Sequence, residues 1–250
     1  MQTNAVVVRT LLVASLVGCG CGGATPGKVS GIALDSQGRP LAGAKIDVCN
    51  PVYFDSCVSA QTGADGRYSL DLQPTNVWTA YASITKTYNG KAYCLDLSPS
   101  STATFSSADG AVRDFQWKLT GQRPDQSDTT QFASFYGAGL SVADDTGNFA
   151  MNDKYVEVTL VPDGPLVDGS AGTTLTLPVG NWNSYVIGNI PLGRYTVSAA
   201  YAPPSSAKSQ LLVATSSFGQ YSSSTVFDFD PDQGGTCGNA EATLHVVLPH

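Results

Sequence analysis

The clearest structural signal in this chain is the stretch Val77-Trp-Thr-Ala-Tyr-Ala-Ser-Ile-Thr-Lys-Thr-Tyr88-Asn89-Gly90-Lys-Ala-Tyr-Cys-Leu-Asp-Leu97. Apolar and polar residues alternate on both sides of Asn89-Gly90, as they do in half-buried β-strands. Asn-Gly is a strong signal for a two-residue hairpin turn, because both turn positions need a positive φ. Such a turn places Ile84 opposite Leu95 and Ala82 opposite Leu97. We therefore predict a long antiparallel hairpin whose apolar faces match.

The same two-residue period runs through the rest of the chain, and no segment shows a convincing amphipathic-helix period. Short alternating segments separated by turn signals predict an all-β protein built as sandwiches or barrels. The segments are 44–49, 67–72 and 115–119 in the first half, and 155–161, 186–199, 226–229 and 242–248 in the second.

Composition limits the classes of partner. Of the 250 residues 42% are hydrophobic and 13% are charged, with 26 Gly and 14 Pro, which suits a turn-rich extracellular β protein. Residues 28–118 carry eight basic and eight acidic side chains, whereas residues from Arg123 onward carry four basic and twelve acidic ones. An acidic second half argues against electrostatic binding to nucleic acid or to anionic lipid headgroups.

The first half carries a motif with a family resemblance. Val29-Ser-Gly31 is followed by Asp35-Ser-Gln-Gly38-Arg-Pro40-Leu-Ala-Gly43-Ala-Lys-Ile-Asp-Val48, and then by Thr62-Gly-Ala-Asp65-Gly66-Arg-Tyr68-Ser-Leu70. This order resembles the carboxypeptidase regulatory-like domain family, which has a transthyretin-like sandwich. The resemblance covers residues 27–120 and implies a non-enzymatic accessory or structural module, with Asp65-Gly66-Arg-Tyr68 forming a hairpin.

The second half repeats this pattern more weakly. Ile190-Pro-Leu-Gly193-Arg-Tyr195-Thr-Val197 resembles the Pro-x-Gly-x-Tyr-x-Val hairpin of such sandwiches, although the Pro-Leu-x-Gly-Ala signature is absent. We predict a second β-sandwich over 131–250. The polar stretch 121–130 is the predicted linker. The predicted fold is thus all-β, with tandem Greek-key or transthyretin-like sandwiches after an N-terminal signal peptide.

The N-terminus predicts secretion. Arg9 precedes an apolar run from Leu11 to Val17, which is too short to span a bilayer and fits a signal-peptide core. Leu16-Val-Gly-Cys19 resembles the lipobox of bacterial lipoproteins, which implies acylation of Cys19 and cleavage before it. Residues 1–18 would be the signal peptide and 19–26 a Gly-rich tether. An ordinary cleaved signal without lipid is the alternative.

Four cysteines belong to the folded part, and spacing alone does not choose among their three pairings. Strand alternation turns Cys49 and Cys57 to the same outer face, and a hairpin centred on Tyr53 would bring them opposite each other. In the strand order that the resemblance implies, the Cys94 strand is two places from the Cys49 strand, roughly 10 Å away and too far for a bridge. We predict Cys49–Cys57. Cys94 and Cys237 are left, either joined across the two domains or free.

Three further constellations could carry chemistry. The carboxylates Asp228, Asp230 and Asp232 have oxygen-ligand spacing, but the Gly is displaced and Asn239 replaces the acidic residue of a calcium loop. Gly139-Leu-Ser141-Val-Ala143 lacks the last Gly of a nucleophile elbow. The aromatic residues that could stack on sugars in loops are Tyr53, Phe54, Trp182 and Tyr185, with Tyr81 and Tyr88 on a presumed outer face.

From the sequence we expect a non-catalytic lipoprotein of the cell envelope without cofactor or metal. It would face an oxidising compartment, and Gly20 after the modified cysteine favours the outer membrane where there are two membranes. Its sandwiches would act as a structural, adhesive or scaffolding module. The alternative is a carbohydrate-binding accessory protein. The expected partners are the membrane, through the lipid on Cys19 (palmitate or a similar acyl chain), and a protein or glycan ligand.

Overall fold

The structure is a computed structural model that describes residues 23–53, 56–74, 77–147, 151–182, 186–204, 206–231 and 237–249. The all-β prediction is confirmed: strands dominate these residues, and the helices among them are three short 3-10 turns. Within these ranges no helix is both long and apolar enough to cross a membrane. The lipidation candidate Cys19 lies outside the described residues.

The first half forms one continuous nine-stranded sheet that folds over itself, in the order β3-β2-β5-β6-β9-β1-β4, with β7 beside β5 and β8 beside β1. Its strands are β1 (Lys28–Leu34), β2 (Lys45–Cys49), β3 (Cys57–Gln61), β4 (Arg67–Asp71), β5 (Val77–Tyr88), β6 (Lys91–Pro99), β7 (Phe105–Ser106), β8 (Ala111–Val112) and β9 (Phe115–Trp117).

The second half forms a sandwich of two sheets, β13-β10-β18-β16 and β12-β11-β14-β15, with β17 beside β14. Its strands are β10 (Ala138–Asp144), β11 (Val156–Pro162), β12 (Leu175–Pro178), β13 (Val186–Ile190), β14 (Arg194–Tyr201), β15 (Ser209–Gln210), β16 (Leu212–Ala214), β17 (Thr225–Asp228) and β18 (Glu241–Val247). The 3-10 turns are η1 (Phe132–Ser134), η2 (Asp153–Tyr155) and η3 (Val179–Asn181).

The predicted Asn89-Gly90 hairpin is confirmed. Both residues have positive φ, 48° for Asn89 and 78° for Gly90, and β5 pairs with β6 so that Ile84 lies opposite Leu95. The ladder ends at Ser83–Asp96, so the predicted pairing of Ala82 with Leu97 is wrong: Leu97 pairs with Trp117 of β9 instead. The inward residues of β5 from Trp78 to Ile84 are buried. Local turn chemistry and side-chain alternation therefore determine this part of the fold.

The two predicted Gly-x-Tyr hairpins are wrong. β3 pairs with β2 while β4 pairs with β1, so the turn at Gly66 joins opposite ends of the first sheet. Likewise β13 pairs with β10 and β14 with β11, so the turn at Gly193 crosses between the two sheets of the second sandwich. Alternation identifies a strand but not its neighbour, because period two looks the same for adjacent and opposed strands.

The tyrosine that follows each of these turns instead fastens its strand to the backbone. The Tyr68 hydroxyl donates to the Arg113 carbonyl at 2.7 Å, and the Tyr195 hydroxyl donates to the Pro191 carbonyl at 2.7 Å. Burial raises the pKa of both hydroxyls. In both tyrosines the buried hydroxyl thus has a hydrogen-bond partner while the ring packs in the core.

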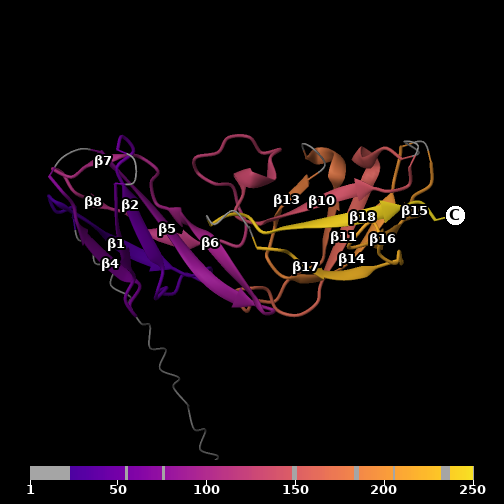
Figure 1. The fold of residues 1–250 in the computed structure, drawn as a ribbon, viewed down its shortest axis with the longest axis horizontal. Coiled ribbons are helices and arrows are strands. Elements are labelled where there is room, and N and C mark those ends of the chain that lie inside the picture. The colour runs from indigo at the N-terminus through magenta and orange to yellow at the C-terminus, as the bar shows by residue number, and fades with distance from the viewer. Residues whose placement is uncertain are drawn as a thin grey trace, which may run out of the picture.

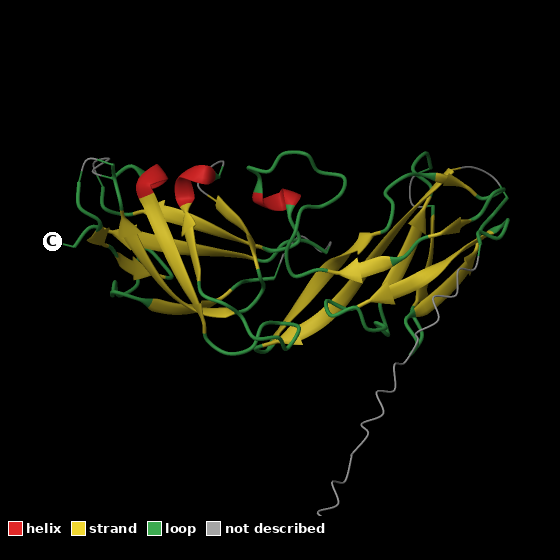
Figure 2. Ribbon diagram, turned by 180° about the vertical axis from the view of Figure 1, so that it is seen from behind, coloured by secondary structure: helices red, strands yellow, loops and turns green. Residues whose placement is uncertain are grey.

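Each half has its own hydrophobic core, and the two halves lie end to end (Figures 1 and 2). The hairpin of β5 and β6 points from the first sandwich toward the second, and the C-terminus lies at the far end of the second sandwich (Figure 1). Tyr93 of β6 belongs to the second core and is only 1% exposed. The predicted hairpin therefore contributes a buried side chain to the core of the other half in addition to its place in the first sheet.

Candidate functional site at the junction of the two sandwiches

The structure separates the predicted sugar-stacking residues. Tyr53 is exposed on the β2–β3 loop of the first sandwich. Trp182 follows η3 in the second sandwich, where its ring packs edge-on against Phe135 with the ring centroids 5.5 Å apart. Phe54 and Tyr185 lie outside the described residues. Tyr53 and Trp182 therefore do not share one platform.

The weak calcium candidates are engaged with other partners. Asp228 accepts a hydrogen bond from the Asn89 amide at 2.7 Å, and Asp230 forms an ion pair with Lys91 at 2.6 Å. Asp232 lies outside the described residues, and those residues contain no group of ligating side chains that could hold a metal. Two of the three carboxylates thus serve the contact between the sandwiches.

Ser141 lies on β10, as its alternation predicts, with Thr243 of β18 beside it in register. His245 is two residues further along β18, where its Nδ1 lies 2.8 Å from a carboxylate oxygen of Asp145. Ser141 lies within a regular strand and not on a sharp turn, and the histidine contacts Asp145 and not Ser141. The segment therefore resembles a nucleophile elbow in sequence but not in structure.

Two disulfide bonds are present. Cys49 is bonded to Cys57, with which it is in register between β2 and β3, and this is the pairing chosen above. Cys94 is bonded to Cys237 with Cα atoms 4.6 Å apart, which joins the two sandwiches. Cys94 lies opposite Thr85, on the face of the hairpin away from Ile84 and Leu95. Of the two alternatives for Cys94 and Cys237, joined across the two domains or free, the structure shows the first.

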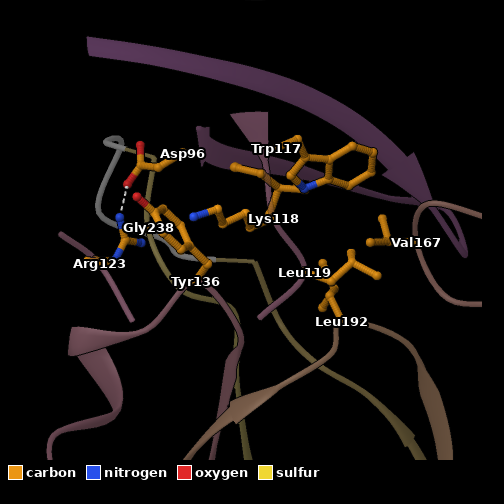
Figure 3. Close-up of a pocket in the computed structure, with 10 residues that line it drawn as sticks. Asp96, Trp117, Lys118, Leu119, Arg123, Tyr136, Val167, Leu192 and Gly238 are labelled. Atoms are coloured by element: carbon orange, nitrogen blue, oxygen red, sulfur yellow. Dashed lines mark hydrogen bonds and ion pairs between the residues drawn. The ribbon is translucent and has the colours of Figure 1, made fainter. Parts of the chain in front are cut away.

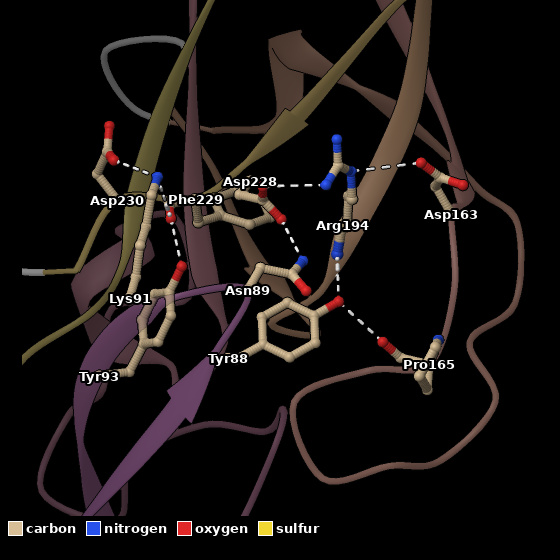
Figure 4. Close-up of polar contacts among 10 residues, drawn as sticks. All are labelled: Tyr88, Asn89, Lys91, Tyr93, Asp163, Pro165, Arg194, Asp228, Phe229 and Asp230. Atoms are coloured by element: carbon tan, nitrogen blue, oxygen red, sulfur yellow. Dashed lines mark hydrogen bonds and ion pairs between the residues drawn. The ribbon is translucent and has the colours of Figure 1, made fainter.

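A polar cluster surrounds the tip of the hairpin (Figure 4). The buried Tyr93 hydroxyl donates to the Phe229 carbonyl at 2.6 Å, and Lys91 reaches Asp230 beside it. Burial, together with the nearby charges of Asp228 and Asp230, raises the pKa of Tyr93 to about 12. A hydroxyl in this setting stays protonated and keeps donating at neutral pH.

Tyr88 is part of this cluster and does not lie on a free outer face. Its hydroxyl donates to the Pro165 carbonyl at 2.8 Å and accepts from the Arg194 backbone N–H at 3.0 Å (Figure 4). Arg194 also lies between the carboxylates of Asp163 and Asp228. The Tyr88 hydroxyl of the first sandwich thereby makes hydrogen bonds to two backbone groups of the second.

The predicted linker is held in place at its start. The Gly121 N–H donates to the Asn189 side chain at 2.7 Å. The Arg123 guanidinium contacts the Asp96 carboxylate of the first sandwich and the Asn239 side-chain oxygen of the second, both at 2.9 Å. Asn239, considered above only as a calcium ligand, in turn donates to the carbonyls of Phe135 and Gly137. These contacts restrain the start of the segment 121–130.

Apolar side chains close the seam between the halves (Figure 3). Leu95, Leu119 and Val167 pack against both hydrophobic cores, and Leu192 lies beside them. The void left among these side chains is only about 10 Å³. Side chains that leave so little free space between them resist bending between the halves.

Sequence reasoning missed the roles of Lys91, Arg123 and Asn239. The only local signal was the Asn89-Gly90 turn, which shows where the hairpin ends but not what it meets. The partners lie more than 100 positions away in the chain, except for Arg123 with Asp96.

A search of protein-family models finds no match, and no curated protein matches the sequence. Among solved structures, the chain is similar to the Bacillus anthracis TIE protein (11% identity, 88% of this chain and 33% of that chain, TM-score 0.32). It is also similar to a streptococcal ancillary pilin (11%, 86% and 62%, TM-score 0.27) and to the shaft pilin SpaA of Lactobacillus rhamnosus GG (12%, 90% and 99%, TM-score 0.26). The chain thus spans a third of the first protein and under two thirds of the second. At these identities and TM-scores the likenesses assign neither a family nor a function.

Proposed function

We propose that this chain is a non-catalytic lipoprotein of the cell envelope whose two sandwiches act as one rigid structural or adhesive module. The observation that carries the proposal is the junction, where a disulfide bond, a buried tyrosine and a closed apolar seam join the halves. Inter-domain interfaces that let domains move are more polar and lack such restraints. A module of this kind holds whatever it displays at a fixed distance from its anchor.

The anchor in this proposal is the lipid on Cys19, supported by the lipobox-like Leu16-Val-Gly-Cys19. Two or three acyl chains bind a membrane stably, because each buried methylene contributes about 0.8 kcal/mol. Metabolic labelling with a palmitate analogue should tag the wild-type protein and the control variant Cys21→Ser. The label should vanish in Cys19→Ser. Label that persists in Cys19→Ser would refute the anchor.

The rigidity of the module has its own test. Small-angle X-ray scattering of the mature chain in detergent should give an end-to-end length that does not change with ionic strength. Reduction of Cys94–Cys237 should broaden the distribution of lengths, because the seam would then depend on non-covalent contacts alone. A wild-type length distribution as broad as that of the reduced protein would argue against a rigid module.

A further inference from the structure

A groove opens on the outer face of the first sandwich, where β5 and β6 separate. The two strands pair from Tyr88–Lys91 as far as Ser83–Asp96, after which β6 turns to pair with β9 from Leu97 onward. At the other end β7 pairs with Val77 and Trp78. The four residues Thr79–Ala82 therefore have no ladder partner on the side away from β2. In an antiparallel strand, two of these four turn their backbone N–H and C=O toward the open side.

The groove has a volume of about 450 Å³ and walls from both sides of the junction. Residues of β5 form one wall and the segment after Gly121 forms the other, with apolar side chains at the base. The lining residues are Thr79–Ala82, Asp96, Leu97, Pro99, Thr102, Phe115, Arg123–Asp125 and Tyr136. This volume is within the range of small-ligand sites, about 300–1,000 Å³.

An aromatic ring stands free at this groove. Tyr81 points outward between the buried Ala80 and Ala82, and it is 57% exposed. Asp96 lies on the same outer face, because it is opposite Ser83, two residues along β5 from Tyr81. An exposed ring with a carboxylate diagonal to it offers one apolar surface and one hydrogen-bonding edge to the same small molecule.

The polar groups of the opposite wall are already fixed. The Arg123 guanidinium is paired with Asp96 and lies over the Tyr136 ring, 4.7 Å from its centroid (Figure 3). Burial raises the pKa of Asp96, against the lowering effect of Arg123, and burial also raises the pKa of Tyr136. Groups held in this way do not lose side-chain freedom when a ligand arrives. Asp125 remains exposed at the rim.

We propose that this groove binds a neutral carbohydrate of one or two sugar units. The Tyr81 ring would stack on the apolar face of a pyranose. The hydroxyl groups of the sugar would form hydrogen bonds with the charged side chains of the groove, with its threonine hydroxyls and with the open β5 backbone. The side chains are Asp96, Arg123, Asp125, Thr79 and Thr102. The site contains none of the predicted loop aromatics, and Tyr81 is the ring it shares with the aromatic residues considered in the sequence analysis. The proposal does not depend on the lipid anchor.

The charges and the shape of the groove decide against two other occupants. Its two carboxylates outnumber its one guanidinium, which disfavours phosphorylated, sulfated or otherwise anionic ligands. An extended peptide that adds to a sheet needs an open strand edge to run along. Here β7 and β6 leave only four residues of β5 unpaired, and both ends of the gap are blocked.

Saturation-transfer NMR tests the proposal on the full mature chain, kept in a detergent without a sugar headgroup. The probes are the methyl glycosides and the β1,4-linked and α1,4-linked disaccharides of glucose, galactose, mannose and N-acetylglucosamine. At least one sugar should receive saturation from the wild-type protein, and its signal should level off at millimolar concentration as the site fills. Tyr81→Ala should weaken that binding by roughly tenfold, as loss of a stacked ring implies. Asp125→Ala should weaken it as well.

Tyr53→Ala is the matched control, because Tyr53 is as exposed as Tyr81 (58%) but lies on the β2–β3 loop and does not line the groove. It should leave binding unchanged, and circular dichroism should show all three variants folded. The proposal is overturned if no sugar of the panel binds, or if Tyr81→Ala binds as well as wild type. It is also overturned if the capped peptide Ac-Thr-Val-Thr-Val-NH2 binds in a Tyr81-dependent way and the sugars do not. Failure of palmitate labelling would leave this result untouched, so the two proposals fail separately.

Discussion

Cys94 and Cys237 lie 143 positions apart in the chain and form a disulfide bond between the two sandwiches. Cys94 belongs to β6 of the first half, and Cys237 lies shortly before β18 of the second. The loop closed by this bond contains the predicted linker and nearly all of the second sandwich. The covalent link is thus placed where the buried Tyr93 and the apolar seam already hold the halves together.

The length of that loop makes a first prediction. In the chain-entropy model, removing the long-range bond with Cys94→Ser and Cys237→Ser should lower the free energy of unfolding by about 5 kcal/mol. The matched double variant Cys49→Ser and Cys57→Ser opens a loop whose ends are only 8 residues apart, and it should cost roughly 2–3 kcal/mol. Urea unfolding followed by tryptophan fluorescence measures both. Equal losses in the two double variants would contradict the entropic account.

Tyr93→Phe should destabilise the junction. The substitution removes the hydroxyl that donates to the Phe229 carbonyl and should cost about 1 kcal/mol at pH 7. The raised pKa of Tyr93, about 12, adds a pH dependence. Since the folded pKa exceeds the unfolded value of about 10, the contribution is complete below pH ~10 and declines as the pH rises toward 12. The gap between wild type and Tyr93→Phe should therefore shrink in this alkaline window in urea titrations. Tyr81→Phe is the control at pH 7, where loss of an exposed hydroxyl should leave the free energy of unfolding nearly unchanged.

Asp168→Asn should destabilise the protein at neutral pH but not at strongly acidic pH. Although burial raises the pKa of Asp168, hydrogen bonds from Ser170 and from Ser36 of the other sandwich outweigh it, and the net pKa is lowered. The carboxylate therefore contributes stability above the unfolded pKa of about 3.9, and this contribution is lost as the pH falls through the lower folded value. We expect a loss of about 1 kcal/mol at pH 7 that disappears at strongly acidic pH. Ser36→Ala, which removes only the contact across the sandwiches, should show a smaller loss; a loss that is the same at every pH would refute the linkage.

Two glycines with similar φ make a fourth test. Gly66 has a φ of +73°, and an added Cβ would lie 2.6 Å from the Ala33 carbonyl oxygen. Gly38 has a φ of +78° but nothing lies within 4 Å of such a Cβ. Gly38→Ala should cost only the conformational penalty, about 1 kcal/mol, while Gly66→Ala should cost more because the backbone must also move. Thermal melting of both variants gives the comparison, and indistinguishable melting temperatures would contradict the close approach.

Much of the fold followed from local patterns. The strands β5 and β6, their register near the turn, and the buried face from Trp78 to Ile84 could be predicted, because alternation and the positive φ of Asn89 and Gly90 depend only on neighbouring residues. The point at which β6 leaves β5 for β9 could not, because it depends on packing between distant strands. The separation of the Cys49 and Cys94 strands by one intervening strand also agrees with the order implied by the resemblance. The two Gly-x-Tyr turns could not be placed, because a turn residue specifies its own φ and not the sheet that its strand joins.

The junction was decided by tertiary structure alone. In the sequence Asp228, Asp230 and Asn239 have the spacing of ion ligands, yet the packing of the second sandwich turns them to Asn89, Lys91 and Arg123. Likewise nothing near Tyr93 distinguishes it from the inward residues of its own sandwich. Which polar group meets which depends on how two sheets pack across more than a hundred residues of chain. Burial at that contact then makes each unpaired donor or acceptor costly, and so selects the partners that the sequence leaves open.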